Sequence, residues 1–190
     1  MKNLPFIRGH KVYIGPMPNT IEFFEIYKSW LNLERVKFGT GDVHDYSTAD
    51  VVKILKKWED DPQNMTFCVY DLKSGQPIGD VCIRYGYEEY DNDGPEAAIM
   101  IGKNYGQGSG FEAMLLLLRY GFQEFNYDQI NLHVYENNTP AVRLFEKLGF
   151  RKTGSRVDKT NERSEYIMTI TRGEFLAISK EYNFSIKKHL

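Results

Sequence analysis

The stretch Ile99–Ala113, IMIGKNYGQGSGFEA, decides the fold of this chain. An apolar run ends at Gly102. A turn with three alternating glycines follows, Gly106, Gly108 and Gly110, and it leads into residues that favour a helix. A strand, a glycine-rich turn and a helix N-terminus in this order can hold a phosphate, because glycine permits positive φ and the first helical N–H groups lack partners inside the helix. A tight turn that holds no ligand fits the glycines alone equally well.

The residues on either side of this turn predict strands and helices of one mixed domain. Helices are expected where apolar residues recur at three- and four-residue spacing, and strands where they alternate between turn residues. The predicted strands cover residues 11–16, 65–70, 77–84, 97–101, 129–135, 150–157 and 165–171. The predicted helices run from 20 to 31, from 47 or 48 to 60, from about 109 to 125, from 139 to 148 and from 173 to 182. The segment 38–46, FGTGDVHDY, is interpreted as a polar loop.

The order of these elements predicts the fold class, an α/β domain of the α+β type. An antiparallel hairpin region precedes a strand–helix–strand crossover, so the sheet is expected to be mixed and mostly antiparallel, with helices on both faces. Ligands bind such sheets at the carboxyl ends of strands where the connectivity changes, here at the end of strand 97–101 beside strand 129–135. The whole chain, 1–190, is expected to form a single domain.

Composition limits the classes of function. The formal net charge of −2 leaves no electrostatic footprint for nucleic acid, and no apolar run approaches the roughly 20 residues needed to cross a bilayer. The first residues, MKNLPFIRGHK, lack the apolar core of a signal peptide, so a cytoplasmic location is predicted. Cys68 and Cys82 form no CxxC and have no nearby histidine, so they are expected to be core thiols, and no metal site is predicted.

A second segment decides between families of phosphate-binding proteins. No Gly-Lys-Ser/Thr follows the turn, which excludes a Walker loop, and the antiparallel strands before it fit a dinucleotide-binding fold poorly. Residues Asn138–Phe150 read NTPAVRLFEKLGF. Together with the turn Tyr105–Gly110, this segment resembles the GCN5-related N-acetyltransferase (GNAT) superfamily, in the branch that acetylates ribosomal-protein N-termini, polyamines or aminoglycosides. The resemblance covers about residues 10–172, with 173–190 as a C-terminal extension.

The resemblance implies that acetyl-coenzyme A (acetyl-CoA) is the cofactor. Its pyrophosphate is expected at the backbone N–H groups of the loop formed by Tyr105, Gly106, Gln107, Gly108, Ser109 and Gly110. In the family, two central parallel strands splay apart, and the pantetheine arm pairs with the open edge of the first, here Ile99, Met100 and Ile101. The second motif implies further contacts with this arm, from Asn138, Ala141 and Phe145.

Two positions depart from the family pattern. Either Tyr105 stands where Gln or Arg is usual, or the loop is one residue short there, and phosphate binding should survive because backbone amides carry it. Phe145 stands where the family often has a Tyr as the general acid that protonates the departing thiolate, and Phe has no proton to give. A non-catalytic acyl-CoA-binding domain therefore remains as one alternative.

The implied reaction is direct attack of a primary amine on the thioester carbonyl, which requires a base. Glu96, at the start of the strand that leads into the turn, is the predicted base, and a solvent-exposed strand-end carboxylate is the alternative interpretation. Tyr135 is the second catalytic candidate. His133 shares its face of the strand and is predicted either to bind substrate or to be a structural histidine.

Two loops are expected to flank the acceptor, one at residues 38–46 and one at residues 85–96. Carboxylates interleaved with aromatic rings suit a cationic amine, although a solvated hairpin end explains them equally well. The predicted substrate-binding residues of these loops are Asp42, His44, Tyr85, Tyr87 and Glu88. The predicted acceptor is a small cationic amine, either a polyamine or an aminoglycoside-like molecule, with a protein N-terminus as the alternative. The resemblance also predicts a homodimer.

Overall fold

The computed structural model describes residues 4–85 and 94–182 of the chain. Its strands are β1 (Ile7–Arg8), β2 (Val12–Gly15), β3 (Asn64–Asp71), β4 (Pro77–Arg84), β5 (Glu96–Ile101), β6 (Gln129–Tyr135), β7 (Arg151–Val157) and β8 (Ser164–Thr171). Its helices are α1 (Ile21–Leu31), α2 (Glu34–Thr40), α3 (Thr48–Asp60), α4 (Ser109–Glu124), α5 (Thr139–Lys147) and α6 (Arg172–Ser179), followed by the 3₁₀ turn η1 (Lys180–Tyr182).

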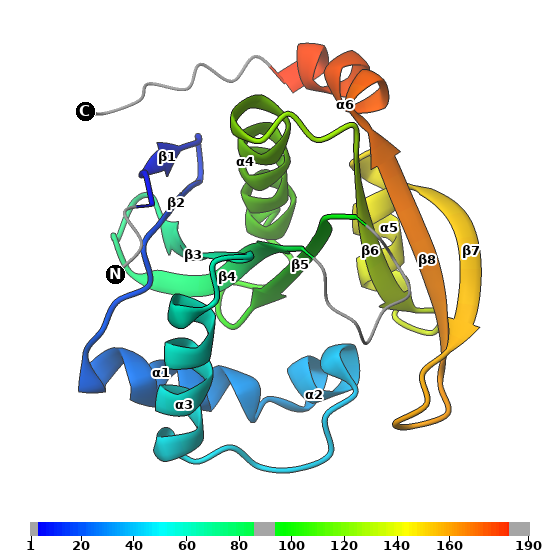
Figure 1. Ribbon diagram of the computed structural model, residues 1–190. Coiled ribbons are helices and arrows are strands. Elements are labelled where there is room, and N and C mark those ends of the chain that lie inside the picture. Colours follow the sequence, from blue (N-terminus) through cyan, green and yellow to red (C-terminus); the bar gives the residue numbers. More distant parts are fainter. Residues whose placement is uncertain (1–3, 86–93, 183–190) are drawn as a thin grey trace.

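The strands form one sheet in the order β1-β2-β3-β4-β5-β6-β8-β7. Neighbouring strands are antiparallel except β5 and β6, which run parallel. Helices α1 and α3 lie on one face of the sheet and α4 lies on the other (Figure 1). The prediction of a mixed, mostly antiparallel α/β fold is therefore confirmed.

The two faces of the sheet carry separate hydrophobic cores. The run Met114–Leu118 of α4 is buried in the first core, which α4 forms mainly with β2, β4 and β5. In the second core, the apolar stripe of α1 packs against α3 and β3, with contributions from Phe23, Tyr27, Trp30, Val51 and Cys68. Cys68 and Cys82 are both buried free thiols, as the sequence predicts.

The parallel pair in the centre of the sheet is splayed. β5 pairs with β4 over its whole length, from Glu96 opposite Arg84 to Ile101 opposite Gly79. It pairs with β6 only where Glu96 lies opposite Asn131. The backbone edge of β5 that faces β6 is therefore free of strand pairing beyond Glu96.

One predicted element is wrong in part. Helix α2 extends to Thr40, so residues 38–40 are helical and do not belong to the predicted polar loop 38–46. This helix has no side-chain cap at Leu33 and carries Gly39 in its last turn, so the usual signals for a helix are missing. It ends at Gly41, whose φ of 80° lies in the left-handed region typical of a residue after a helix. Strand β1 was also not predicted, because two residues are too short for a recognisable pattern.

Candidate active site

A cavity of about 390 Å³ lies along the free edge of β5, between β5, β6, α2 and α5. Among its lining residues are Tyr105 from the predicted pyrophosphate loop and the predicted contacts of the cofactor arm: Ile99, Met100, Ile101, Asn138, Ala141 and Phe145. Glu96, His133 and Tyr135 line the same cavity. The fold therefore brings the predicted cofactor edge and the predicted catalytic residues into one space.

The loop before α4 has the geometry of an anion-binding turn. Gly106 and Gly108 have φ values of 81° and 82°, which side chains other than that of glycine rarely adopt. Gly108 is the N-cap of α4 and has no side chain, so no cap side chain accepts from the first N–H groups of the helix. The loop that precedes them is exposed to solvent at residues 105–108. A Cβ at Gly110 would lie 3.4 Å from the side chains of Ile99 and Ile101, so the loop sits directly against the end of β5. These features fit the pyrophosphate of a coenzyme A molecule.

Helix α2 contributes Arg35 to the end of the same strand edge. Nη2 of Arg35 donates to the carbonyl oxygen of Ile101 at 3.3 Å and to that of Gly102. Its guanidinium lies 5.5 Å from the centre of the Tyr105 ring. Arg35 could not be selected from the sequence because α2 was not predicted, and the residue adds a positive charge where the edge of β5 meets the glycine loop.

Glu96 lines the cavity and is buried, with 7% of its surface exposed. Its Oε1 lies 3.5 Å from Nδ1 of His133 and 3.5 Å from Nη2 of Arg84. The alternative of a solvent-exposed strand-end carboxylate is therefore wrong, because Glu96 occupies the one position where β5 pairs with both neighbouring strands. Arg84 lies opposite Glu96 in the β4–β5 register, so correct pairing of these strands would have revealed it.

Tyr135 lines the cavity with its hydroxyl group already engaged. The hydroxyl donates to Oδ2 of Asp158 at 2.5 Å and accepts from Nδ2 of Asn161 at 2.8 Å, while the Arg163 guanidinium lies 3.5 Å from the ring centre. Burial raises the pKa of Tyr135 to about 12, and the hydrogen bond to Asp158 acts in the same direction. This arrangement suits a residue that shapes the cavity better than one that releases a proton.

Of the predicted substrate-binding residues, His133 lines the cavity, whereas Asp42, His44 and Tyr85 lie away from it. Asp42 accepts from Oγ1 of Thr40 at 2.9 Å, and the His44 ring lies 4.5 Å from that of Tyr46; neither Asp42 nor His44 lines the cavity. Tyr85 stacks against Tyr127 with ring centres 6.3 Å apart and lines a separate hollow. Tyr87 and Glu88 lie outside the described residues.

Two carboxylates that the sequence analysis did not select line the cavity, Asp158 and Glu165. Glu165 is 7% exposed, and its Oε2 accepts from Nε of Arg156 at 2.8 Å. Glu165 is the cross-strand partner of Tyr135 in the β6–β8 pairing, and Asp158 follows β7 directly. Their position depends on the pairing of β8 with β6, which the sequence alone did not specify.

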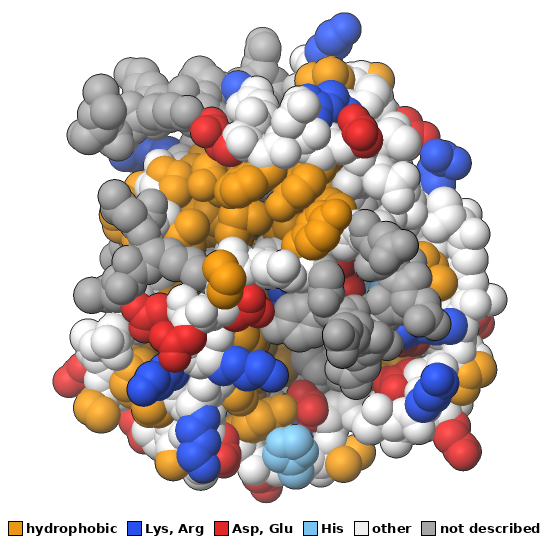
Figure 2. Space-filling model, viewed as in Figure 1, with side chains coloured by type: hydrophobic (Ala, Val, Ile, Leu, Met, Phe, Trp, Pro, Cys, Tyr) orange, Lys and Arg blue, Asp and Glu red, His pale blue; other side chains and the backbone are white. Residues whose placement is uncertain are grey.

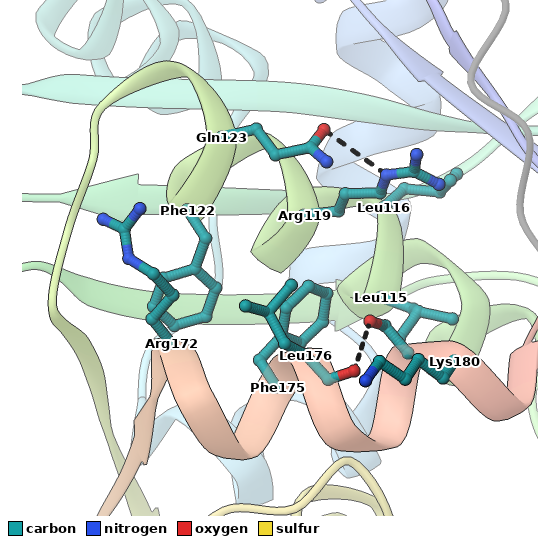
Figure 3. Close-up of a pocket in the computed structure, with 10 residues that line it drawn as sticks. Leu115, Leu116, Arg119, Phe122, Gln123, Arg172, Phe175, Leu176 and Lys180 are labelled. Carbon is teal, nitrogen blue, oxygen red and sulfur yellow. Dashed lines mark hydrogen bonds between the residues drawn. The ribbon is translucent and has the colours of Figure 1, made fainter.

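Other hollows are larger and have a different character. A groove of about 780 Å³ lies between α4 and α6, where Phe122, Phe175 and Leu176 face one another (Figure 3). Figure 2 shows hydrophobic side chains gathered over α4. A further hollow of about 800 Å³ contains Tyr85 and residues of β6, β7 and β8. Neither includes the open edge of β5 or the glycine loop, so volume does not identify the site.

Comparison with known proteins assigns the family. The model of the acetyltransferase (GNAT) domain matches residues 19–151, so the chain belongs to the GNAT family and is an acetyltransferase. The N-acetyltransferase 9-like protein of Caenorhabditis briggsae is 28% identical over 138 residues, which cover 67% of this chain and 69% of that protein. The alpha/beta-tubulin-N-acetyltransferase 9 of Drosophila melanogaster is 26% identical over 161 residues, covering 77% and 78% of the two chains.

Solved structures share the fold. A GNAT-family acetyltransferase from Bacillus anthracis has a TM-score of 0.73 at 22% identity and covers 87% of this chain and 98% of its own. The spermidine N-acetyltransferase of Vibrio cholerae, in complex with CoA and spermine, has a TM-score of 0.74 at 21% identity and the same coverage.

Two further observations concern only the part of the chain that the structure describes. It contains no group of three or more His, Cys, Asp or Glu side chains that could hold a metal ion. None of its helices combines the length and the apolar character needed to cross a membrane.

Proposed function

We propose that this acetyltransferase uses acetyl-CoA and transfers the acetyl group to a primary amine by direct attack. One observation carries the proposal: the open edge of β5 leads from the glycine loop to the buried Glu96 within a single cavity. The cofactor would be held by the loop Tyr105–Gly110, by the strand edge Ile99–Ile101 and by Asn138. When bound, it supplies a thioester carbonyl as the electrophile.

Glu96 is the proposed base. An alkylammonium group must lose a proton before it can attack, and the Glu96 carboxylate can accept that proton directly or through one water molecule. Arg84 and His133 lie within 3.5 Å of Oε1 and fix the carboxylate in the cavity. Phe145 also lines the cavity but offers no proton, so the thiolate departs without an acid at that position.

The first proposed acceptor is a small cationic amine. Three carboxylates line the cavity, Glu96, Asp158 and Glu165, and they favour a positively charged ligand. The spermidine acetyltransferase of Vibrio cholerae has the same fold, which makes a polyamine a natural first compound to test.

The second proposed acceptor is the α-amino group of a protein. Each of the three cavity carboxylates already has a partner: Arg84 lies beside Glu96, Arg156 donates to Glu165, and Tyr135 donates to Asp158. The site therefore carries less free negative charge than the count of carboxylates suggests, and one amine would suit it better than a polycation. A relative in Drosophila melanogaster is named a tubulin N-acetyltransferase, which supports the same choice.

Thiol release from acetyl-CoA tests the proposal and separates the two acceptors. The panel contains spermidine, an aminoglycoside, a lysine-free peptide with a free N-terminus, and the same peptide with a blocked N-terminus. Turnover of spermidine or the aminoglycoside supports the first acceptor, and turnover of only the free peptide supports the second. Binding of CoA without turnover of any amine would favour the non-catalytic alternative.

Glu96→Gln tests the proposed base. The substitution should lower turnover by about 100-fold or more and flatten the rise of the rate with pH. Glu59→Gln, at an exposed position of α3, is the matched control and should leave both unchanged. An unchanged pH–rate profile for Glu96→Gln would remove Glu96 from the mechanism.

A cytoplasmic location and a homodimer are part of the same proposal. Two buried free thiols suit a reducing compartment. Light scattering of the purified protein would test the dimer.

A further inference from the structure

The hairpin formed by β1 and β2 lies beside α4 (Figure 1). It covers residues 7–15, whereas the GNAT family model begins to match at residue 19. The hairpin therefore lies outside the residues matched by the family model, and its turn reaches the amino end of α4, where the glycine loop ends.

One buried carboxylate fastens the hairpin turn to α4. Glu112, in the first turn of α4, is 4% exposed and accepts from three successive backbone N–H groups: those of His10, Lys11 at 2.7 Å and Val12 at 3.1 Å. A Cβ at Gly9 would lie 2.6 Å from Oε1 of Glu112, so the turn approaches the carboxylate as closely as its backbone allows. The backbone of Lys11 is thus fixed relative to the loop.

The side chain of Lys11 reaches back over the phosphate loop. Its Nζ donates to the carbonyl oxygen of Gln107 at 3.0 Å. It also lies 3.1 Å from the point that a Cβ at Gly108 would occupy. The ammonium group therefore stands at the middle of the loop, next to the glycine that caps α4.

Charge gives this position a consequence. A carboxylate in the first turn of α4 would repel a phosphate, but the hairpin N–H groups already satisfy the one on Glu112. The exposed Lys11 ammonium adds a positive charge beside the loop, and its hydrogen bond to a neutral carbonyl can be exchanged for a stronger one to an anion.

We propose that Lys11 is a cofactor-binding residue whose ammonium group contacts a phosphate of coenzyme A. Its place at the middle of the loop favours the pyrophosphate over the 3′-phosphate. The inference rests on the proposed function, since it requires that the loop binds coenzyme A.

Calorimetric titration with CoA, without any acceptor, tests this inference. Lys11→Met keeps the length of the side chain and removes its charge, and it should weaken CoA binding about 5- to 20-fold, between the values for an exposed ion pair and a charge-assisted hydrogen bond. Lys11→Arg should retain affinity within about threefold because it keeps the charge. Lys53→Met, on the exposed side of α3, is the matched control and should bind as the wild type does.

Two further measurements separate a direct contact from a change in loop structure. The affinity of Lys11→Met should depend less steeply on salt than that of the wild type, because one ionic contact is missing. Titration with 3′-dephospho-CoA identifies the phosphate: an equal loss for both ligands indicates the pyrophosphate, and a loss that disappears indicates the 3′-phosphate.

The outcomes distinguish this inference from the proposed function. If the wild type binds CoA and Lys11→Met binds it within twofold with the same salt dependence, the role of Lys11 is refuted and the proposed function stands. If the wild type binds no CoA, both are refuted.

Discussion

Replacing Glu112 by alanine should destabilise the protein by removing the anchor of the β1–β2 hairpin. The carboxylate accepts the N–H groups of His10, Lys11 and Val12, and only Val12 among these residues is fully buried. A buried donor left without its acceptor costs about 1–3 kcal/mol, and each of the two donors in part-buried hydrogen bonds, which water can reach once the carboxylate is removed, costs about 0.5 kcal/mol. The expected loss in the free energy of unfolding is therefore about 2–4 kcal/mol.

Thermal unfolding measures this loss directly. For a domain of this size, 1 kcal/mol corresponds to about 2–4 °C, so Glu112→Ala should lower Tm by about 5–15 °C. Glu112→Gln retains one acceptor oxygen and should lose about half as much. Glu124→Ala, at the exposed end of the same helix, should change the free energy of unfolding by no more than about 0.5 kcal/mol.

A small effect would refute the argument. If Glu112→Ala unfolds within 1 °C of the wild type (a threshold of about 0.5 kcal/mol), the three N–H bonds do not hold the hairpin. The fixed position of Lys11 would then lose its structural support. A Glu112→Ala variant that is destabilised and also binds CoA more weakly would instead connect the hairpin with the cofactor site.

Three other substitutions test separate parts of the structure. Burial raises the pKa of Asp80 to about 7, so the unfolded chain loses this proton near pH 4 and the native state keeps it until about pH 7. The contribution of Asp80 to stability therefore falls as pH rises from about 4 to 7. Asp80→Asn keeps an acceptor for the Tyr27 hydroxyl and should reduce this fall in the free energy of unfolding, measured by urea titration at several pH values. If the free energy of unfolding of the variant and of the wild type fell in parallel with pH, the argument would be contradicted. Phe145→Tyr should raise the rate of thiol release and add a falling limb at high pH, where the phenol ionises; a slower enzyme would contradict a role in proton donation. Gly41→Ala should lower the free energy of unfolding by about 1–3 kcal/mol in the same titrations, because the φ of 80° is strained for alanine and the new Cβ would lie 2.1 Å from the Tyr135 hydroxyl. A variant as stable as the wild type would contradict this packing.

The parts of the site that were predicted from the sequence depend on the backbone. The loop Tyr105–Gly110 requires glycines with positive φ, and the edge Ile99–Ile101 requires a strand that is followed by a helix. Both features can be recognised in the local sequence. The splayed pair followed from the resemblance, and the single β5–β6 pairing at Glu96 agrees with it.

The parts that were missed depend on which strands and loops become neighbours. Arg84 faces Glu96 only through the β4–β5 register, and Glu165 reaches the cavity only because β8 pairs with β6. Tyr85 was expected at the acceptor site, but its ring stacks on Tyr127 instead. Local composition cannot distinguish these outcomes, since a polar or aromatic residue beside a strand end can turn to either side.

Helix α2 shows why the open strand edge is compatible with a stable fold. Unpaired backbone carbonyls at a cavity wall are costly unless they find donors, and β5 leaves its edge unpaired by β6 beyond Glu96. Arg35 of α2 donates to Ile101 and Gly102 at the loop end of that edge, so a side chain takes over part of what a neighbouring strand would supply. A pantetheine arm that binds the same edge must either bind beside this guanidinium or displace it from the carbonyl oxygens. The guanidinium has five N–H donors, so it can also bind a nearby phosphate. Helix α2, which has no recognisable sequence signal, therefore supplies hydrogen-bond donors to the end of the β5 edge that adjoins the glycine loop.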